Sequence, residues 1–110
     1  MDIQPETEKK LQQLQIFEQN LQQLQSQRQA LEMQISEMDS ALEELEKTKK
    51  AYKIVSSIMV ASDIPKLKED LKSKKEVVQL RIKTLEKQEK STKEKATSLQ
   101  EEVLKEMQGG

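Results

Sequence analysis

The sequence predicts a mostly helical chain, a long antiparallel two-helix coiled coil whose helices are joined by a short β-hairpin. Three observations support this fold class: two long heptad stretches, a β-branched segment between them, and a composition with 35% charged and only 2% aromatic residues. Such a composition leaves little for a sealed core and is typical of long helices. We expect one domain over residues 1–110, with a helix over about 6–50, a hairpin over 52–61, a second helix over 64–107 and a flexible tail over 108–110.

The first helix is predicted by apolar residues that are spaced alternately by three and four, which is a coiled-coil seam. Pro5 and Glu6 suit the first helical turn, because that turn tolerates proline and favours acidic side chains. Arg28 is the one seam position that is not apolar. The ten positions are Leu14, Phe17, Leu21, Leu24, Arg28, Leu31, Ile35, Met38, Leu42 and Leu45.

A hairpin is predicted between the helices, because residues 52–60 are rich in β-branched and apolar side chains around a polar pair, Ser56 and Ser57. The turn lacks the glycine or asparagine that two-residue hairpins prefer. An alternative therefore stays open, in which the first helix continues to about Val60 and the chain bends near Asp63.

The second helix is predicted to begin near Ile64. Ser62 and Asp63 are candidate caps, and Pro65 suits the first turn. Seven of its ten seam positions are apolar. They are Leu71, Lys75, Val78, Ile82, Leu85, Glu89, Thr92, Ala96, Leu99 and Val103.

The two seams pair with each other if the chain folds back on itself. Leu45 then faces Leu71 and Leu14 faces Val103, with residue numbers that sum to 116 or 117 throughout. Arg28 falls opposite Glu89, which predicts an ion pair that fixes the register of the helices. The net charges of residues 1–45 and 46–110, −6 and +5, also favour this pairing.

Composition excludes most catalytic chemistry. The chain has no cysteine and no histidine, and its only glycines are Gly109 and Gly110. Thiol, zinc-finger, histidine-based and glycine-loop phosphate sites are therefore absent, and we expect no enzyme, no cofactor and no metal. Mixed charge and few aromatic residues argue against nucleic-acid binding. No stretch suits a leader or a membrane span, so we expect a cytoplasmic protein without membrane contact.

Two groups of apolar residues suggest binding surfaces. An isolated two-stranded hairpin has unpaired edges, so subunit assembly is predicted at Tyr52, Ile54, Val55, Ile58, Met59 and Val60. Apolar residues also lie near both ends of the chain. Those off the seam, Ile3, Leu11, Ile16, Leu104 and Met107, are expected to face solvent. All the apolar residues near the ends predict a tip that binds other chains, unless they are scattered surface residues, and they are Ile3, Leu11, Leu14, Ile16, Phe17, Leu99, Val103, Leu104 and Met107.

The order coil, hairpin, coil, together with the segments over 52–60 and 81–90, resembles the β class of the prefoldin family, archaeal type. The resemblance covers nearly the whole chain. Ser56 and Ser57 depart from the family pattern, in which a glycine is frequent at the turn, and this departure bears on the turn type.

The resemblance implies a hexamer of two α-class and four β-class subunits, whose hairpins form a β-barrel body. It implies an ATP-independent chaperone that holds unfolded proteins at the tips of its coiled coils and delivers them to a group II chaperonin. The competing hypothesis is a structural or adaptor coiled-coil protein, in which residues 52–60 are a linker and the seams engage another helix.

Overall fold

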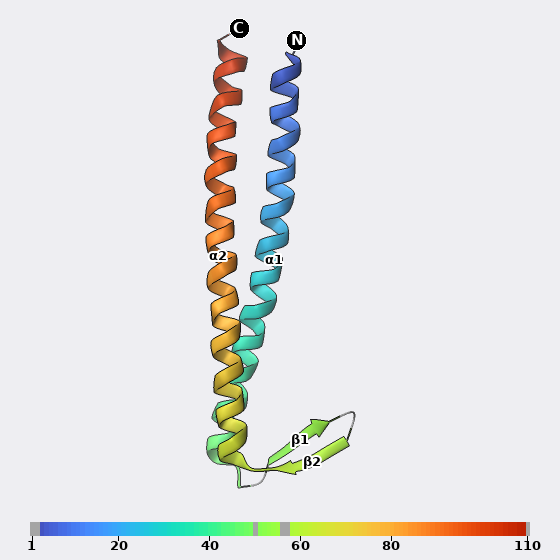
Figure 1. The fold of residues 1–110 in the computed structure, drawn as a ribbon, viewed down its shortest axis with the longest axis vertical. Helices are drawn as coiled ribbons and strands as arrows, with labels where there is room; N and C mark the ends of the chain where they lie inside the picture. Colours follow the sequence, from blue (N-terminus) through green and yellow to red (C-terminus); the bar gives the residue numbers. More distant parts are fainter. Residues whose placement is uncertain (1–2, 50, 56–57, 110) are drawn as a thin grey trace. The chain divides into compact units, whose positions relative to one another are not determined.

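The computed structural model describes residues 3–49, 51–55 and 58–109. In chain order its elements are helix α1 (Pro5–Lys47), strand β1 (Ala51–Val55), strand β2 (Ile58–Ser62) and helix α2 (Ile64–Gln108) (Figure 1). The chain forms two compact units, with Met1–Gln29 and Thr84–Gly110 in unit 1 and Ala30–Lys83 in unit 2. The predicted fold class, two long antiparallel helices with a short hairpin between them, is confirmed.

Helix α1 begins at Pro5, where the missing amide hydrogen of proline costs no helical bond. The Glu8 N–H donates to the Gln4 carbonyl oxygen at 3.0 Å and closes the first turn. The helix ends at Lys47, three residues before the predicted end at 50. Beyond it, the Thr48 hydroxyl donates to the Glu44 carbonyl oxygen at 2.8 Å, which satisfies a carbonyl that the helix leaves free at its end.

Strands β1 and β2 lie side by side as an antiparallel pair, in register from Ala51 opposite Ser62 to Val55 opposite Ile58. The predicted hairpin is confirmed, with five residues in each strand. The alternative of a first helix that continues to Val60 is wrong, because these residues form a strand ladder. The predicted turn at residues 56–57 lies outside the described residues.

Helix α2 begins directly after Asp63, whose carbonyl oxygen accepts the Leu67 N–H at 3.0 Å. It ends at Gln108, one residue later than predicted. Gln108 was expected in the flexible tail but is helical, because the backbone bonding continues to Gly109, whose N–H donates to the Lys105 carbonyl oxygen at 2.7 Å. The remaining tail residue, 110, lies outside the described residues.

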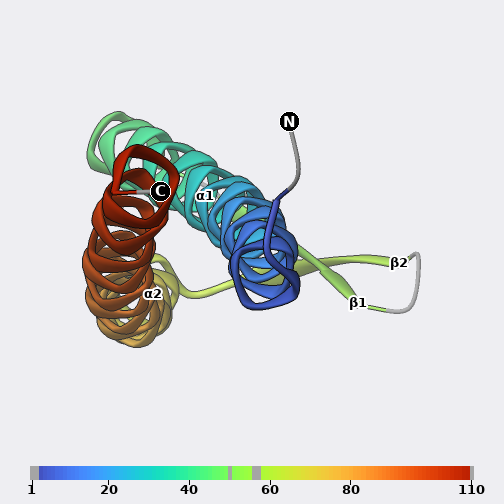
Figure 2. The same ribbon diagram turned by 90° about the horizontal axis from the view of Figure 1, so that it is seen from above.

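The buried side chains follow the predicted seams. All twenty predicted seam positions are half-buried or buried, whereas most positions between them are exposed. Val103 in unit 1 and Val78 in unit 2 are the most buried apolar residues in the described part of the chain. In unit 1 the first turns of α1 and the last turns of α2 run beside each other, so these two helix ends share one tip (Figures 1 and 2).

Candidate functional site

The hairpin of unit 2 exposes apolar side chains on both faces. Successive residues of a strand point to opposite faces, so Ile54 and its partner Met59 share one face, while Val55 and Ile58 share the other. Ile54 is 69% exposed and Met59 is 70% exposed. Within the described residues the sheet has two strands only, so each strand has an unpaired edge.

All six residues predicted for subunit assembly are exposed in this hairpin. None of the described residues of unit 2 covers them. A cluster of exposed apolar side chains beside unpaired backbone groups is the surface that strand addition uses. The hairpin therefore has unpaired strand edges and uncovered apolar faces, and additional strands from other chains would pair with those edges and cover those faces.

The tip of unit 1 contains the nine residues predicted to bind other chains, and the structure divides them into two sets. Four are exposed, namely Ile3, Ile16, Leu104 and Met107. Five are buried or half-buried, four of them at seam positions, namely Leu11, Leu14, Phe17, Leu99 and Val103. The expectation that Leu11 faces solvent is wrong: it is half-buried, because it lies one turn before Leu14 and borders the seam.

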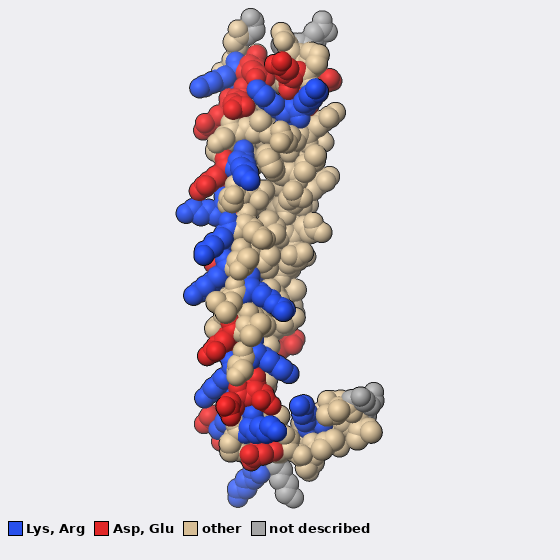
Figure 3. Space-filling view, viewed as in Figure 1, with Lys and Arg blue, Asp and Glu red and all other residues tan. Residues whose placement is uncertain are grey.

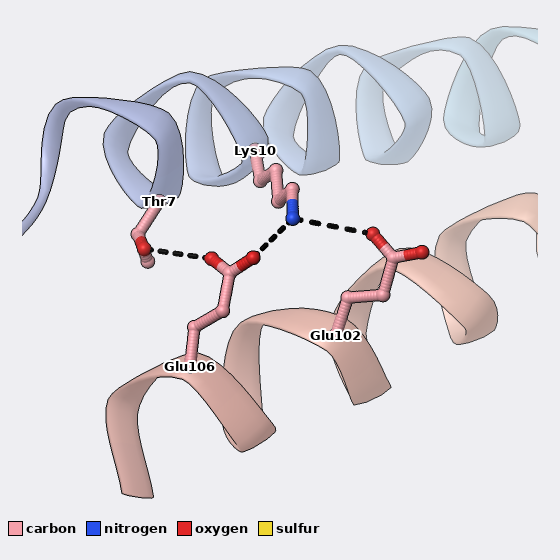
Figure 4. Close-up of polar contacts among 4 residues, drawn as sticks. All are labelled: Thr7, Lys10, Glu102 and Glu106. Atoms are coloured by element: carbon pink, nitrogen blue, oxygen red, sulfur yellow. Dashed lines mark hydrogen bonds and ion pairs between the residues drawn. The ribbon is translucent and has the colours of Figure 1, made fainter. Parts of the chain in front are cut away.

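A polar cluster closes the seam at this tip (Figure 4). The Thr7 hydroxyl donates to Glu106 Oε2 at 2.7 Å, and Lys10 Nζ donates to Glu106 Oε1. Lys10 also lies 3.4 Å from Glu102 Oε2. We call these four residues, Thr7, Lys10, Glu102 and Glu106, the tip clasp.

The tip clasp joins the first turns of α1 to the last turns of α2. Thr7 is only 4% exposed, so its hydroxyl depends on Glu106 as a partner. The hydrogen bonds from Lys10 and Thr7 lower the pKa of the Glu106 carboxyl below its ordinary value. The hydrogen bond to Glu106 raises the pKa of Lys10, against a smaller opposing effect of desolvation.

A shallow open groove, about 370 Å³ in volume, lies on unit 1 next to the tip clasp. Phe17 and Leu99 supply apolar parts of its lining, and Glu102 is shared between the groove and the clasp. The polar lining residues are Gln13, Ser91, Glu94, Lys95 and Ser98. Apolar seam side chains are thus reached from the surface through this groove.

Arg28 and Glu89 meet inside unit 1, where Arg28 Nε donates to Glu89 Oε2 at 2.7 Å. Glu89 is 7% exposed, and within the described residues its second oxygen, Oε1, is buried without a hydrogen-bond partner. The contact is the one that the pairing of the seams predicts. Its role in fixing the register is a proposal that the experiment opening the Discussion tests.

The charges of unit 1 are distributed unevenly between the helices. Lysine, arginine and acidic side chains follow α2, whereas the neighbouring surface of α1 is largely uncharged in this view (Figure 3). Between residues 12 and 29 the first helix has only Glu18 and Arg28 as charged residues and is otherwise rich in glutamine. Among the described helices, none combines the length and apolarity that crossing a membrane requires.

Sequence reasoning missed the tip clasp, although the heptad contains a signal for it. Counting back from Leu14 by four and seven residues gives Lys10 and Thr7, and counting forward from Val103 by three gives Glu106. These positions continue the seam with polar residues in place of apolar ones. A search for apolar spacing alone ends before it reaches them.

Comparisons with known proteins agree with this geometry. The family described as "Prefoldin subunit" matches residues 8–110. The chain is 35% identical to the "Prefoldin subunit beta" of Thermococcus onnurineus over 93% of this chain and 90% of that protein. It is 37% identical to the "Prefoldin subunit beta" of Thermoplasma acidophilum over 84% of this chain and 78% of that protein.

A solved structure, that of the prefoldin beta subunit from Thermococcus strain KS-1, superposes with a TM-score of 0.87 at 31% identity, covering 93% of this chain and 92% of that one. The fold and these matches define a coiled-coil hairpin protein of the chaperone type. The chain belongs to the prefoldin family of chaperones. The resemblance to the β class of that family is confirmed.

Proposed function

We propose that this chain is a subunit of an ATP-independent holdase, which binds unfolded proteins at the coiled-coil tip and delivers them to a group II chaperonin. In this proposal residues 1–110 act as one prefoldin-like domain in the cytoplasm, with no cofactor and no enzymatic activity. Two α-class and four β-class subunits assemble through their hairpins. The observation that carries the proposal is the hairpin of unit 2, whose apolar residues are exposed on both faces of a two-stranded sheet.

Assembly is the expected fate of such a hairpin, since a two-stranded sheet alone is marginally stable in water and its edges accept further strands. Within the assembly, several tips would be held close together. Weak contacts at each tip then combine through effective concentration, so one unfolded chain is held without a deep pocket at any single tip. Neither step uses a nucleotide.

The tip supports capture by its chemistry. Ile16, Leu104 and Met107 are exposed, and methionine adapts its shape to different apolar partners. An unfolded protein exposes apolar segments of varied sequence, which such a surface binds without specific hydrogen bonds. Release follows when the client folds or when a chaperonin competes for the same segments, because each withdraws the client's apolar segments from the tip.

The test is aggregation of a chemically unfolded client, followed by light scattering, in the presence of the chain assembled with an α-class prefoldin subunit. Tip substitutions Ile16→Ser, Leu104→Ser and Met107→Ser together are expected to weaken the suppression of aggregation at unchanged assembly. The matched control replaces three exposed apolar residues of unit 2, Met33, Val77 and Leu80, by serine.

Equal suppression by the tip variant and the control variant would reject the tip as the capture surface. The competing adaptor hypothesis predicts no suppression by any of these proteins. A nucleotide requirement for suppression would contradict the ATP-independent mechanism.

A further inference from the structure

The tip of unit 1 holds more apolar surface than it exposes. Four of the nine predicted tip residues are exposed, whereas the other five are buried or half-buried, in the seam or at its border. Val103 is the extreme case, at 4% exposed. A client that contacts the closed tip therefore meets fewer than half of these side chains fully exposed, and a tip whose helices separate would expose all nine.

The contacts that keep the tip closed differ from those along the rest of the seam. From Leu14 inward the seam of α1 is apolar apart from Arg28, and burial holds it together. Outward from Leu14 the seam positions are Lys10 and Thr7, which are held by Glu106. The ion pairs of Lys10 lie near the surface, where such pairs contribute little net stability and are exchanged readily for contacts with water.

The clasp residues lie next to the apolar side chains that are covered when the tip is closed. Glu106 follows Val103 by three residues, nearly one helical turn, and Glu102 directly precedes it. Thr7 and Lys10 flank the same turns of α1 from which Leu11 projects. Separating these turns would uncover Val103 and Leu11 first, and the groove lined by Phe17 and Leu99 would open from its Glu102 side.

We propose that the tip clasp sets how far the two helix ends separate, and that its opening fully exposes the five buried or half-buried apolar residues of the tip to an unfolded client. Thr7, Lys10, Glu102 and Glu106 are positioning residues in this mechanism, since they act through the apolar side chains behind them. The inference rests on the proposed holdase function. It adds to that function a closed state with limited capture surface and an open state with a larger one.

The test uses the chain assembled with an α-class subunit and weakens or locks the clasp. Glu106→Gln keeps the shape of the side chain and an acceptor for Thr7 but removes the ion pair with Lys10. Lys10→Met removes the same pair from the other helix. The matched control is Lys47→Met, which breaks the exposed pair between Lys47 and Glu43 in unit 2, where Nζ and Oε1 are 4.0 Å apart.

Locking uses the absence of cysteine in this chain. Thr7→Cys with Glu106→Cys places two thiols on the facing helix ends, and a flexible bismaleimide joins them without the strict geometry of a disulfide. The same double variant without the crosslinker is the control for the substitutions themselves. Hydrogen exchange of peptides from residues 3–14 and 99–109 measures opening, and client aggregation measures capture.

Glu106→Gln and Lys10→Met are expected to speed exchange in both tip peptides and to lower the concentration needed to suppress aggregation, each by up to about fivefold, the range of a surface pair. The crosslinked variant is expected to slow exchange and to raise that concentration. Lys47→Met is expected to change neither.

Two results overturn the inference. If locking the tip leaves suppression at the wild-type level, or if faster exchange in Glu106→Gln and Lys10→Met leaves it unchanged, the clasp does not control capture, and the holdase function itself stands. If the wild-type assembly does not suppress aggregation at all, the proposed function fails and the inference fails with it.

Discussion

Replacing Arg28 by methionine tests the polar layer of the seam and should destabilise the helix pair. The substitution leaves the Glu89 carboxylate 7% exposed and without the guanidinium that now donates to it at 2.7 Å. Removing one partner of a fully buried pair costs about 3–5 kcal/mol. The Arg28 side chain is 26% exposed, so water partly replaces it, and we expect a loss of about 2 kcal/mol.

The double variant Arg28→Met with Glu89→Met should recover most of this loss. It removes both charges, together with the buried Oε1 atom that has no hydrogen-bond partner in the described structure. Apolar replacement of a buried ion pair is frequently neutral or stabilising, so we expect a stability within about 1 kcal/mol of wild type. If the pair fixes the register, the helices of this variant should also align in more than one register. Crosslinking between the two helices would then join a wider set of residue pairs than in the wild type.

Urea unfolding followed by circular dichroism at one fixed protein concentration gives these free energies of unfolding. The comparison requires that the slope of the free energy against urea concentration is the same in each variant. Lys47→Met is the control, since it breaks an exposed pair that contributes at most about 0.5 kcal/mol. Our reasoning is refuted if Arg28→Met costs no more than this control, or if the double variant is as unstable as Arg28→Met alone.

Two further predictions concern the hairpin and the tip clasp. The double variant Ile54→Asp with Met59→Asp places two facing carboxylates on one face of the hairpin. It should abolish assembly with an α-class subunit, while the helical circular dichroism of the chain alone stays unchanged. Retained assembly in sedimentation would argue against the hairpin as the interface. Hydrogen bonds from Lys10 and Thr7 lower the pKa of Glu106, and Glu102 is the other charged group at the cluster. The ionised Glu106 carboxylate therefore contributes stability above the ordinary glutamate pKa of about 4.3, and this contribution is lost as the pH falls through the lowered pKa. The stability difference between wild type and Glu106→Gln should therefore be seen at neutral pH and vanish in acid, and a difference that persists unchanged in acid would contradict this.

The sequence predicts the seams well because heptad spacing is a direct consequence of helix geometry. Alternating steps of three and four place Leu14, Leu21 and Leu31 on one stripe, and burial follows that stripe. The facing of Arg28 and Glu89 follows from the same geometry, since an antiparallel pair keeps the sum of residue numbers constant. Side chains contact each other at these layers because this arrangement buries both seams within one chain.

Helix ends and polar contacts are less predictable from the sequence. The end of α1 at Lys47 depends on where the backbone leaves the helix for β1, which is a competition between a few local hydrogen bonds. The tip clasp was missed because threonine, lysine and glutamate are common on any helix surface. Heptad position places Glu106 on the seam stripe and Glu101 off it, but the hydrogen bonds of Glu106 depend on the facing helix. The exposure of Leu11 was misjudged because residues that border a seam are half-covered by the partner helix.

The measurement that tests the central claim most directly is sedimentation velocity of this chain, alone and after mixing with an α-class prefoldin subunit. We predict that the chain alone sediments as a small species and that the mixture forms one discrete species near the mass of six chains. Two components that sediment independently in the mixture would contradict assembly through the hairpin and leave the adaptor hypothesis as the better account.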